Sequence, residues 1–334
     1  MPKFEPEKWN DGDKGGKVKN ANNCYDYAAD KLSGKDYDSP EFRKSRPGRK
    51  AGKPLKRAPF SCNDIQTAIE ADRFRPSTKD AECPDTCWKV AVMILGNKDK
   101  GEDYHFVRRD DNGSWSHKQG EGPAKQTDSK GDPITDPDRA DIRWKDPETK
   151  VETKYLVCGY YCCCPDVSVA TLAPERPPVF AAVDLKERGR LTTRSLDLHL
   201  PPGRYTILSG EVFMPSDAVL VTAVVFSGED NPRWALEPAD LEVVGGKIAG
   251  LPRTDRRPEY LTGYQGFIIS NAAGIGGLPA QITVYDGLVS LWSGAGSVEW
   301  FEDASGLEHW LLCRLAEQPD AERLRRVSEP SDER

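Results

Sequence analysis

The chain has 334 residues, and 47 lysines and arginines against 54 aspartates and glutamates give it a formal net charge of −7. This acidic balance gives no electrostatic argument for a nucleic-acid partner. No stretch is apolar enough to span a bilayer, and residues 1–6 lack the apolar segment of a secretory signal peptide. The location is therefore unknown: a cytoplasmic protein and a protein exported by a dedicated secretion machine both fit.

The distribution of lysines divides the chain into two predicted domains. Only Lys186 and Lys247 follow residue 175, and a chain of this length exceeds the usual size of one domain. We expect a linker at Glu175–Pro178. The predicted division is a flexible N-terminus over residues 1–20, a first domain over 21–170, a β-rich domain over 176–317 and a disordered charged tail over 318–334.

The first predicted element carries a cysteine at its start. Residues 25–32 predict a short helix, for which Asn22 and Asn23 are good N-cap residues. Cys24 would then lie in the first turn, where the positive end of the helix dipole stabilises a thiolate. A buried or disulfide-bonded cysteine is the alternative. The two asparagines could supply an oxyanion-hole donor, although capping alone also explains them.

Three features precede the histidines along the chain. Residues 43–50 form a local basic cluster with proline and glycine, which favours a solvated loop over an anion site. Residues 62–72 predict a helix capped near Ser61 or Asn63. Residues 89–96 are an apolar run that ends in glycine, and they predict a strand.

Two of the four histidines fall on one predicted hairpin. Residues 105–109 and 114–118 predict strands joined by a turn at residues 110–113. His105 and His117 could therefore approach each other across the pair. A cysteine nucleophile needs a base within hydrogen-bond reach and a third group that orients the base. Cys24, His105 and His117 have the residue types and the order that this chemistry requires.

This order resembles the papain-like hydrolases of the NlpC type, in which a cysteine precedes a histidine at the head of a strand and a second polar residue on the next strand. The similarity covers roughly residues 20–165 and extends to a group of uncharacterised bacterial proteins. It implies that Cys24 is the nucleophile, His105 the base and His117 its orienter. Asp103, Asp136 and Asp138 compete for the third role. The segments that carry the resemblance are Asn22–Tyr25, Arg46–Gly52, Asp103–Phe106, Trp115–Gly120, Asp136–Asp141 and Val157–Tyr160.

The cysteines leave three chemical states open. Eight of the nine lie in the first 164 residues, and Cys313 alone comes later. Cys83–Cys87 and Cys158–Cys162 have the same spacing, and two further cysteines follow directly. Structural zinc, disulfides and reduced packing cysteines all fit this pattern. Disulfides would need an oxidising compartment, and the odd number leaves at least one thiol free, which could be Cys24.

Residues 176–317 read as mostly β. His199 and His309 are isolated there, so neither is expected to be catalytic. The four tryptophans of this part predict core packing, with a binding face for glycan or protein as the alternative. Short strands separated by turns are typical of a sandwich, and we expect them at residues 179–183, 204–208, 218–226, 266–269, 282–285, 289–292, 297–301 and 309–313.

The sequence thus predicts an α+β papain-like domain followed by a mostly antiparallel, sandwich-like β domain. The expected function is a cysteine-dependent hydrolase that cleaves an amide bond in a peptide or peptidoglycan-like substrate. The second domain would position the substrate or bind a protein partner. The alternatives are a non-catalytic binding or structural protein with a disulfide-stabilised first domain, an effector-type protein that acts through protein contacts, and a zinc- or redox-dependent switch. No cofactor, metal, nucleic acid or membrane span is expected, and a bacterial effector role is analogy alone.

Overall fold

The computed structural model of the protein is built mainly from antiparallel β-strands. Among the described residues, more lie in strands than in helices, and every described strand pair is antiparallel. The prediction of an α+β papain-like domain is therefore wrong. The structure describes residues 1–10, 17–32, 44–146, 150–169, 181–185, 189–192, 197–200, 203–208, 211–213, 218–258, 264–295, 297–318, 321 and 324.

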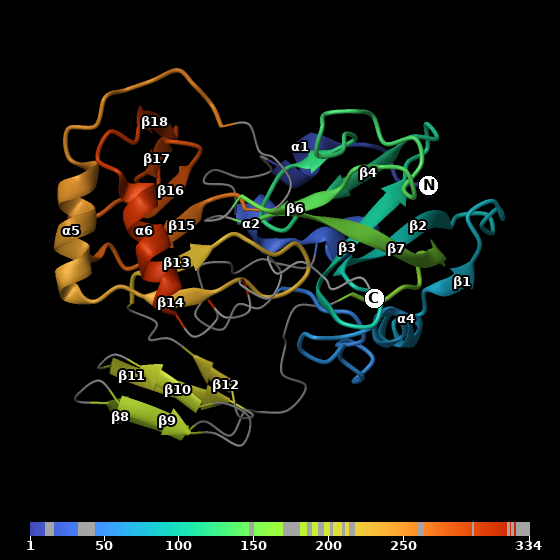
Figure 1. Cartoon of the computed structure of the whole chain (residues 1–334), viewed down its shortest axis with the longest axis horizontal. Helices are drawn as coiled ribbons and strands as arrows, with labels where there is room; N and C mark the ends of the chain where they lie inside the picture. Colours follow the sequence, from blue (N-terminus) through green and yellow to red (C-terminus); the bar gives the residue numbers. More distant parts are fainter. Residues whose placement is uncertain are drawn as a thin grey trace.

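The first sheet has the strand order β1-β7-β2-β3-β4-β5, and β6 pairs with β7 (Figure 1). The predicted strands at 89–96, 105–109 and 114–118 are confirmed, although β3 begins earlier than expected. Strand β2 is buried along almost its whole length, which explains its continuous apolar run instead of an alternating one. Strand β3 is equally buried, although it carries polar side chains such as Asp103 and His105. The strands are β1 Arg75–Ser77, β2 Trp88–Gly96, β3 Gly101–Arg109, β4 Trp115–Lys118, β5 Ala124–Lys125, β6 Arg143–Lys145 and β7 Glu152–Cys163.

Short helices pack against this sheet. Helix α3 contacts β3 and β4, and it begins after Asn23, whose side-chain oxygen accepts from the backbone N–H of Tyr25 and of Asp26. Ser61 caps α4 in the same way. The helix predicted at 62–72 is confirmed, and the one predicted at 25–32 is confirmed at its start but ends at Ala28. The described helices before residue 150 are too short to form a papain-like helical layer. The helices are α1 Pro6–Asn10, α2 Lys17–Ala21, α3 Cys24–Ala28 and α4 Cys62–Ala71.

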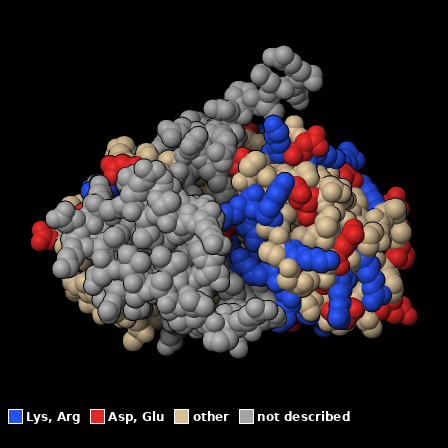
Figure 2. Space-filling view, turned by 90° about the horizontal axis from the view of Figure 1, so that it is seen from below, with Lys and Arg blue, Asp and Glu red and all other residues tan. Residues whose placement is uncertain are grey.

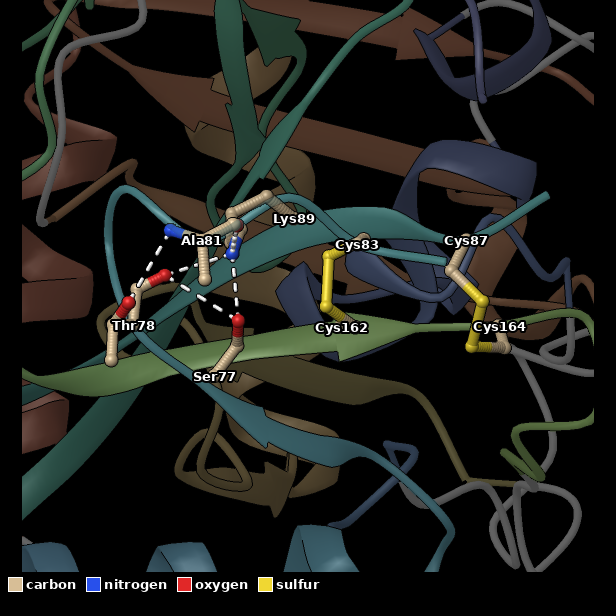
Figure 3. The surroundings of a disulfide bond; sticks show 8 residues. All are labelled: Ser77, Thr78, Ala81, Cys83, Cys87, Lys89, Cys162 and Cys164. Carbon is tan, nitrogen blue, oxygen red and sulfur yellow. Dashed lines mark hydrogen bonds between the residues drawn. A yellow bond between two sulfur atoms is a disulfide. The ribbon is translucent and has the colours of Figure 1, made fainter. Parts of the chain in front are cut away.

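Three disulfides connect β7 to the elements beside it. Cys62–Cys158 joins the start of α4 to β7. Cys83–Cys162 and Cys87–Cys164 join the segment before β2 to the end of β7 (Figure 3). The ammonium group of Lys89 lies in the same region and donates to the Ser77 hydroxyl and to nearby backbone carbonyls. These six cysteines therefore form disulfides and not a zinc site.

The second half contains two small sheets and one larger sheet. The larger one has the strand order β14-β13-β15-β16-β17-β18, and the small ones have the orders β10-β9 and β12-β11-β8. Most of the predicted strands are confirmed here. The strands are β8 Ala181–Leu185, β9 Gly189–Thr192, β10 Asp197–Leu200, β11 Gly203–Leu208, β12 Glu211–Phe213, β13 Leu220–Ala223, β14 Arg233–Ala235, β15 Phe267–Ser270, β16 Gln281–Tyr285, β17 Leu288–Trp292 and β18 Glu299–Glu302.

Helices on the larger sheet replace the second layer of the expected sandwich. Helix α5 (Pro238–Ile248) was not predicted, and the strand expected at 309–313 is part of helix α6 (Leu307–Ala316). A 3-10 turn, η1 (Ile275–Gly277), lies beside α5. Trp234 and Trp292 are buried, as core packing predicts, whereas Trp300 and Trp310 are only partly buried. The prediction of a sandwich-like second domain is therefore wrong as well.

One apolar core extends across the first and the larger sheet. Ala91 and Val107 of the first sheet belong to the same buried cluster as Val221 and Ile282 of the larger sheet. Figure 1 shows these sheets next to each other. The domain boundaries proposed above stay predictions, and the linker expected at 175–178 lies outside the described residues. Among the described helices, none has the length and apolar character needed to cross a membrane.

The basic cluster predicted as a solvated loop divides between surface and interior. Lys50 is exposed, but Lys44 and Arg46 are buried. These two side chains pair with the carboxylates of Glu121 and Glu229. The solvated-loop prediction is therefore wrong for Lys44 and Arg46, because both side chains are buried and each forms an ion pair with a buried carboxylate. Other Lys and Arg side chains gather on one face of the described part of the protein (Figure 2).

Candidate functional site

Cys24 lies at the first residue of α3, against β3. Its side chain is fully buried and forms no disulfide. The sulfur lies 3.9 Å from the carbonyl oxygen of Tyr104, and the Ser227 side chain is close enough to influence the thiol. Its other surroundings are an apolar cluster that includes Phe106. The predicted place of Cys24 in the first turn is confirmed, and the neighbouring hydroxyl is a feature that the sequence did not reveal.

His105 and His117 meet across the predicted hairpin. Val107 is the register partner of His117, and side chains two residues apart in a strand lie on the same face. The Nε2 atom of His105 lies 2.8 Å from Nδ1 of His117. The Nε2 atom of His117 lies 2.9 Å from the carbonyl oxygen of Thr127. The expectation that the two rings face each other is confirmed.

These contacts define the proton positions of two neutral rings. The Thr127 carbonyl can only accept, so His117 carries its proton on Nε2 and accepts on Nδ1. His105 must then donate from Nε2 and accept on Nδ1. The Nδ1 atom of His105 lies 2.6 Å from the Ser227 hydroxyl, which therefore donates to it. His105 is thus placed as a base toward Ser227, and Ser227 stands between this ring and the sulfur of Cys24.

Ser227 enters the site on the connection between β13 and β14, residues 224–232. The buried carboxylate of Asp103 accepts hydrogen bonds from the backbone N–H of Ser227, Gly228 and Glu229, with donor–acceptor distances of 2.6, 3.0 and 2.8 Å. It also accepts from the Tyr155 hydroxyl at 2.7 Å. Asp103 therefore holds this connection in the site instead of orienting His117.

Close packing also ties the 224–232 connection to the first sheet. A Cβ atom added to Gly228 would lie 2.2 Å from the ring of Tyr104, so only glycine allows this approach. The carbonyl of Gly228 accepts a hydrogen bond from the side-chain amide of Asn23. No sequence signal marks these contacts, because they join residues more than a hundred positions apart.

Burial keeps the thiol and both imidazoles uncharged. Desolvation raises the pKa of Cys24 to about 12, and the neighbouring Ser227 side chain opposes this only in part. Desolvation lowers the pKa of His117 to about 4. It also lowers the pKa of His105 well below 6.5, and the neighbouring His117 adds to that effect. At neutral pH the sulfur is therefore a thiol, despite its place at the start of a helix.

The neutral histidine pair predicts acid sensitivity of the fold. A histidine whose folded pKa lies below its unfolded value of 6.5 contributes stability above 6.5, and this contribution is lost as the pH falls toward the folded pKa. Between pH 6.5 and about pH 5 we expect each ring to lower the free energy of unfolding by about 2 kcal/mol. Chemical denaturation across this range measures the slope.

The exposed His309 supplies the control for this prediction. It lies on α6 and its side chain does not enter the buried pair. A His309→Asn variant should keep the full slope, whereas a His105→Asn/His117→Asn double variant should lose most of it. Equal slopes in wild type and double variant would show that the buried rings are not the origin of the acid sensitivity.

The remaining predicted site residues have other partners. The Asn23 side chain caps α3 and its amide donates to the carbonyl of Ser45 at 2.8 Å. The Asn22 amide donates to a carbonyl of α2. The capping interpretation of Asn23 is confirmed, and the oxyanion role of either residue stays a prediction. Asp136 and Asp138 both pair with Lys79. Within the described residues, no group of His, Cys, Asp and Glu side chains could hold a metal ion.

Comparison with known proteins gives one relationship. Insoluble matrix shell protein 1 from Ruditapes philippinarum is 32% identical to this chain over 139 residues, which are 42% of this chain and 80% of the relative. The chain belongs to the family of this shell matrix protein. No family model matches the chain, and no solved structure matches it. The relationship covers most of the shell matrix protein and less than half of the present chain.

Proposed function

We propose that this chain is a non-catalytic structural or binding protein whose first sheet is held by disulfides. The observation that carries the proposal is the state of Cys24, which is fully buried with a pKa raised to about 12. The thiolate is the reactive form of cysteine, so a thiol in this setting is inert. The ring nitrogens of His105 already bond Ser227 and His117, which leaves no nitrogen to deprotonate the sulfur.

The disulfides support a role in an oxidising environment. Disulfides persist mainly in secreted and extracellular proteins and are rare where thiols are kept reduced. All three bonds lie around β7 and connect positions that are 77 to 96 residues apart. They stabilise the folded first sheet, since each bond restricts a long segment of the unfolded chain, and such stabilisation is expected of a structural protein.

The family relationship supports the same proposal. The relative's name describes an insoluble matrix protein of a shell and does not refer to catalysis. By extension, we propose that this chain serves as a component or binding partner in a protein matrix. This extension applies to the shared segment of 139 residues, so the remaining part of the chain could add a function of its own.

A cysteine-dependent amide hydrolase is the second candidate. One observation favours it: Ser227, His105 and His117 form a series of hydrogen-bonded side chains, and Cys24 neighbours its Ser227 end. A nucleophile, a base and an orienting group are the parts that covalent catalysis requires, and they follow the order of the NlpC-type hydrolases. In this candidate the 224–232 connection must leave, so that the sulfur meets His105 and a peptide reaches both.

Thiol alkylation separates the two candidates. In the native protein at about pH 7, we expect iodoacetamide to modify the exposed Cys313 and to leave the buried Cys24 and Cys163 unmodified. Unfolding without reductant should expose both buried thiols, and unfolding with reductant should expose all nine cysteines. Mass spectrometry of the labelled peptides identifies which cysteines are modified under each condition.

Cys313 is the internal control because it is free and exposed in the same molecule. Labelling of Cys24 in the native state at a rate similar to that of Cys313 would contradict the structural proposal and support the hydrolase. A protein in which Cys24 stays unlabelled while Cys313 reacts would have no accessible nucleophile at this site.

A further inference from the structure

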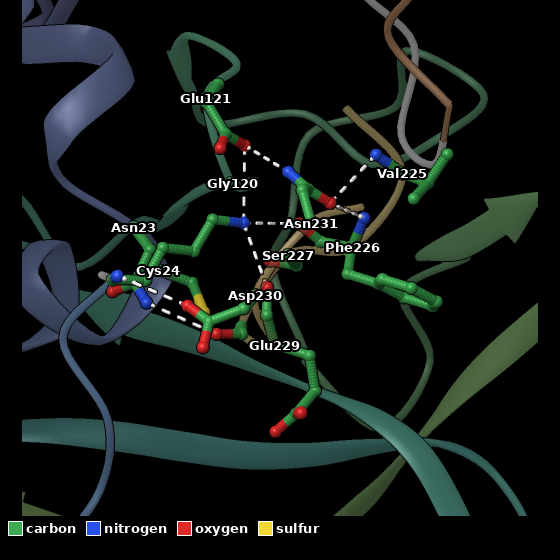
Figure 4. Close-up of polar contacts among 12 residues, drawn as sticks. Asn23, Cys24, Gly120, Glu121, Val225, Phe226, Ser227, Glu229, Asp230 and Asn231 are labelled. Carbon is green, nitrogen blue, oxygen red and sulfur yellow. Dashed lines mark hydrogen bonds and ion pairs between the residues drawn. The ribbon is translucent and has the colours of Figure 1, made fainter. Parts of the chain in front are cut away.

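Three buried side chains from distant parts of the sequence meet beside the candidate site. They are the amine of Lys44, the carboxylate of Glu121 and the amide of Asn231, and each residue is less than a tenth exposed. Figure 4 shows Glu121 above Asn231, with the 224–232 connection running below them. Lys44 and Glu121 come from the first half of the chain, and Asn231 comes from the β13–β14 connection.

The Glu121 carboxylate contacts both nitrogen groups with the same oxygen. Its Oε2 atom lies 3.3 Å from the Lys44 Nζ and accepts a hydrogen bond from the Asn231 Nδ2 at 2.8 Å. A single carboxylate oxygen therefore bridges an amine and an amide. This is the position in which a general base can take a proton from one nitrogen and give it to the other.

The amide oxygen of Asn231 lies in a site that stabilises negative charge. It accepts hydrogen bonds from the backbone N–H groups of Val225 and Phe226 at 3.0 and 2.7 Å. Two backbone donors on one carbonyl oxygen form an oxyanion hole, because they stabilise the charge that develops when a nucleophile attacks the carbonyl carbon. The same donors make that carbon more electrophilic.

The Lys44 amine is held in place by further contacts. It donates to the carbonyl oxygens of Phe226 at 2.8 Å and Glu229 at 3.1 Å. Both carbonyls belong to the same connection as Asn231. Nucleophile and electrophile are thus held around one oxygen of the proton carrier before any reaction, which can replace a large part of the entropy cost of a bimolecular step.

We propose that Lys44 and Asn231 become joined by an intramolecular isopeptide bond, with Glu121 as the proton carrier. Glu121 first takes a proton from the Lys44 ammonium, which leaves a neutral amine. The amine nitrogen attacks the Asn231 side-chain carbonyl carbon, and a carbon–nitrogen bond forms. Glu121 passes protons from the attacking nitrogen to the amide nitrogen, the bond from the carbon to this nitrogen breaks, and ammonia leaves. No oxidant or reductant is needed.

This bond goes beyond the proposed structural function, because it would join the two halves of the chain where no disulfide does. The described disulfides all lie within residues 62–164. An isopeptide bond from residue 44 to residue 231 would keep the 224–232 connection in the Cys24 site under reducing conditions as well.

The mass of the intact protein tests the proposal. After reduction and alkylation in denaturant, the wild type should be about 17 Da lighter than its sequence mass, the mass of one ammonia. A protease digest should contain one branched peptide that links residue 44 to residue 231. A folded wild type at its full sequence mass would overturn the proposal, and so would a loss of ammonia without the branched peptide.

Three variants identify the chemistry. Glu121→Gln keeps the size and the bridging oxygen but cannot carry a proton, so the branched peptide should fall at least about 100-fold. Lys44→Arg keeps the positive charge and should show the full sequence mass. Lys50→Arg changes an exposed lysine of the same segment, and this variant should still lose one ammonia. Labelling of Cys313 alone in the native state checks that each variant is folded. A branched peptide at the wild-type level in Glu121→Gln would remove the assigned role of Glu121.

Discussion

Reduction of the three disulfides should lower the free energy of unfolding by about 4 kcal/mol for each bond. The bonds close segments of 96, 79 and 77 residues, and the entropy that a cross-link removes from the unfolded chain grows with the length of the closed segment. The total approaches the whole stability of a typical domain, so the first sheet should unfold in the reduced protein. Guanidinium denaturation with and without reductant, followed by tryptophan fluorescence, measures the difference.

Paired serine variants resolve the contribution of a single bond. A Cys62→Ser/Cys158→Ser variant removes the bond between α4 and β7 and should lose about a third of the effect. The matched control is Cys313→Ser, which removes an exposed thiol that forms no disulfide and should leave the stability unchanged. If the guanidinium midpoint does not change on reduction, the apolar core alone is sufficient to stabilise the first sheet.

The sequence could not reveal which cysteines pair, although it limits the possibilities. Side chains alternate along a strand, so Cys162 and Cys164 had to lie on one face of β7 and Cys163 on the other. The structure agrees, since Cys163 is a free thiol in an apolar cluster. The partners depend on how β2 pairs with β7, where Trp88 lies opposite Cys163. That register is a long-range property, and the identical spacing of two cysteine pairs contains no information about it.

The candidate site was predictable where its residues are close in sequence. The Asn23 cap, the place of Cys24 and the contact of His105 with His117 all follow from local patterns. Ser227 was not predictable, because it reaches His105 from a position 122 residues away. The Ser227 hydroxyl bonds the Nδ1 atom of His105, which the ring would need in order to deprotonate Cys24. The local pattern therefore predicted a catalytic base, but the contact with Ser227 argues against one.

The error in fold class has a similar origin. The apolar residues 309–313 were assigned to a strand, yet they belong to α6, which buries Leu307, Leu311 and Leu315. That spacing of four is a helical period, but a window of five residues is too short to distinguish it from a buried strand. In the first half, the helix and strand predictions were mostly right. Their assembly into a papain-like domain relied on resemblance, and the described helices are too short for it.

Replacing Asp103 by alanine should release the 224–232 connection and cost about 4 kcal/mol in the free energy of unfolding. The carboxylate is fully buried and accepts hydrogen bonds from three consecutive backbone N–H groups and from the Tyr155 hydroxyl. Its removal leaves these donors without an acceptor away from water, which costs far more than a typical hydrogen bond contributes. Thermal or chemical denaturation measures the loss, and an Asp85→Ala variant at an exposed position should change the stability by less than about 0.5 kcal/mol.

The same variant tests whether the connection is what separates Cys24 from His105. Without Asp103, the backbone of Ser227 to Glu229 loses its anchor, and the hydroxyl that stands between sulfur and ring should move away. We then expect iodoacetamide to label Cys24 in the native state, where the wild type resists. If Asp103→Ala is as stable as Asp85→Ala and Cys24 stays unlabelled, the close packing of Gly228 against Tyr104 or the proposed bond between Lys44 and Asn231, and not the carboxylate, holds the connection in place.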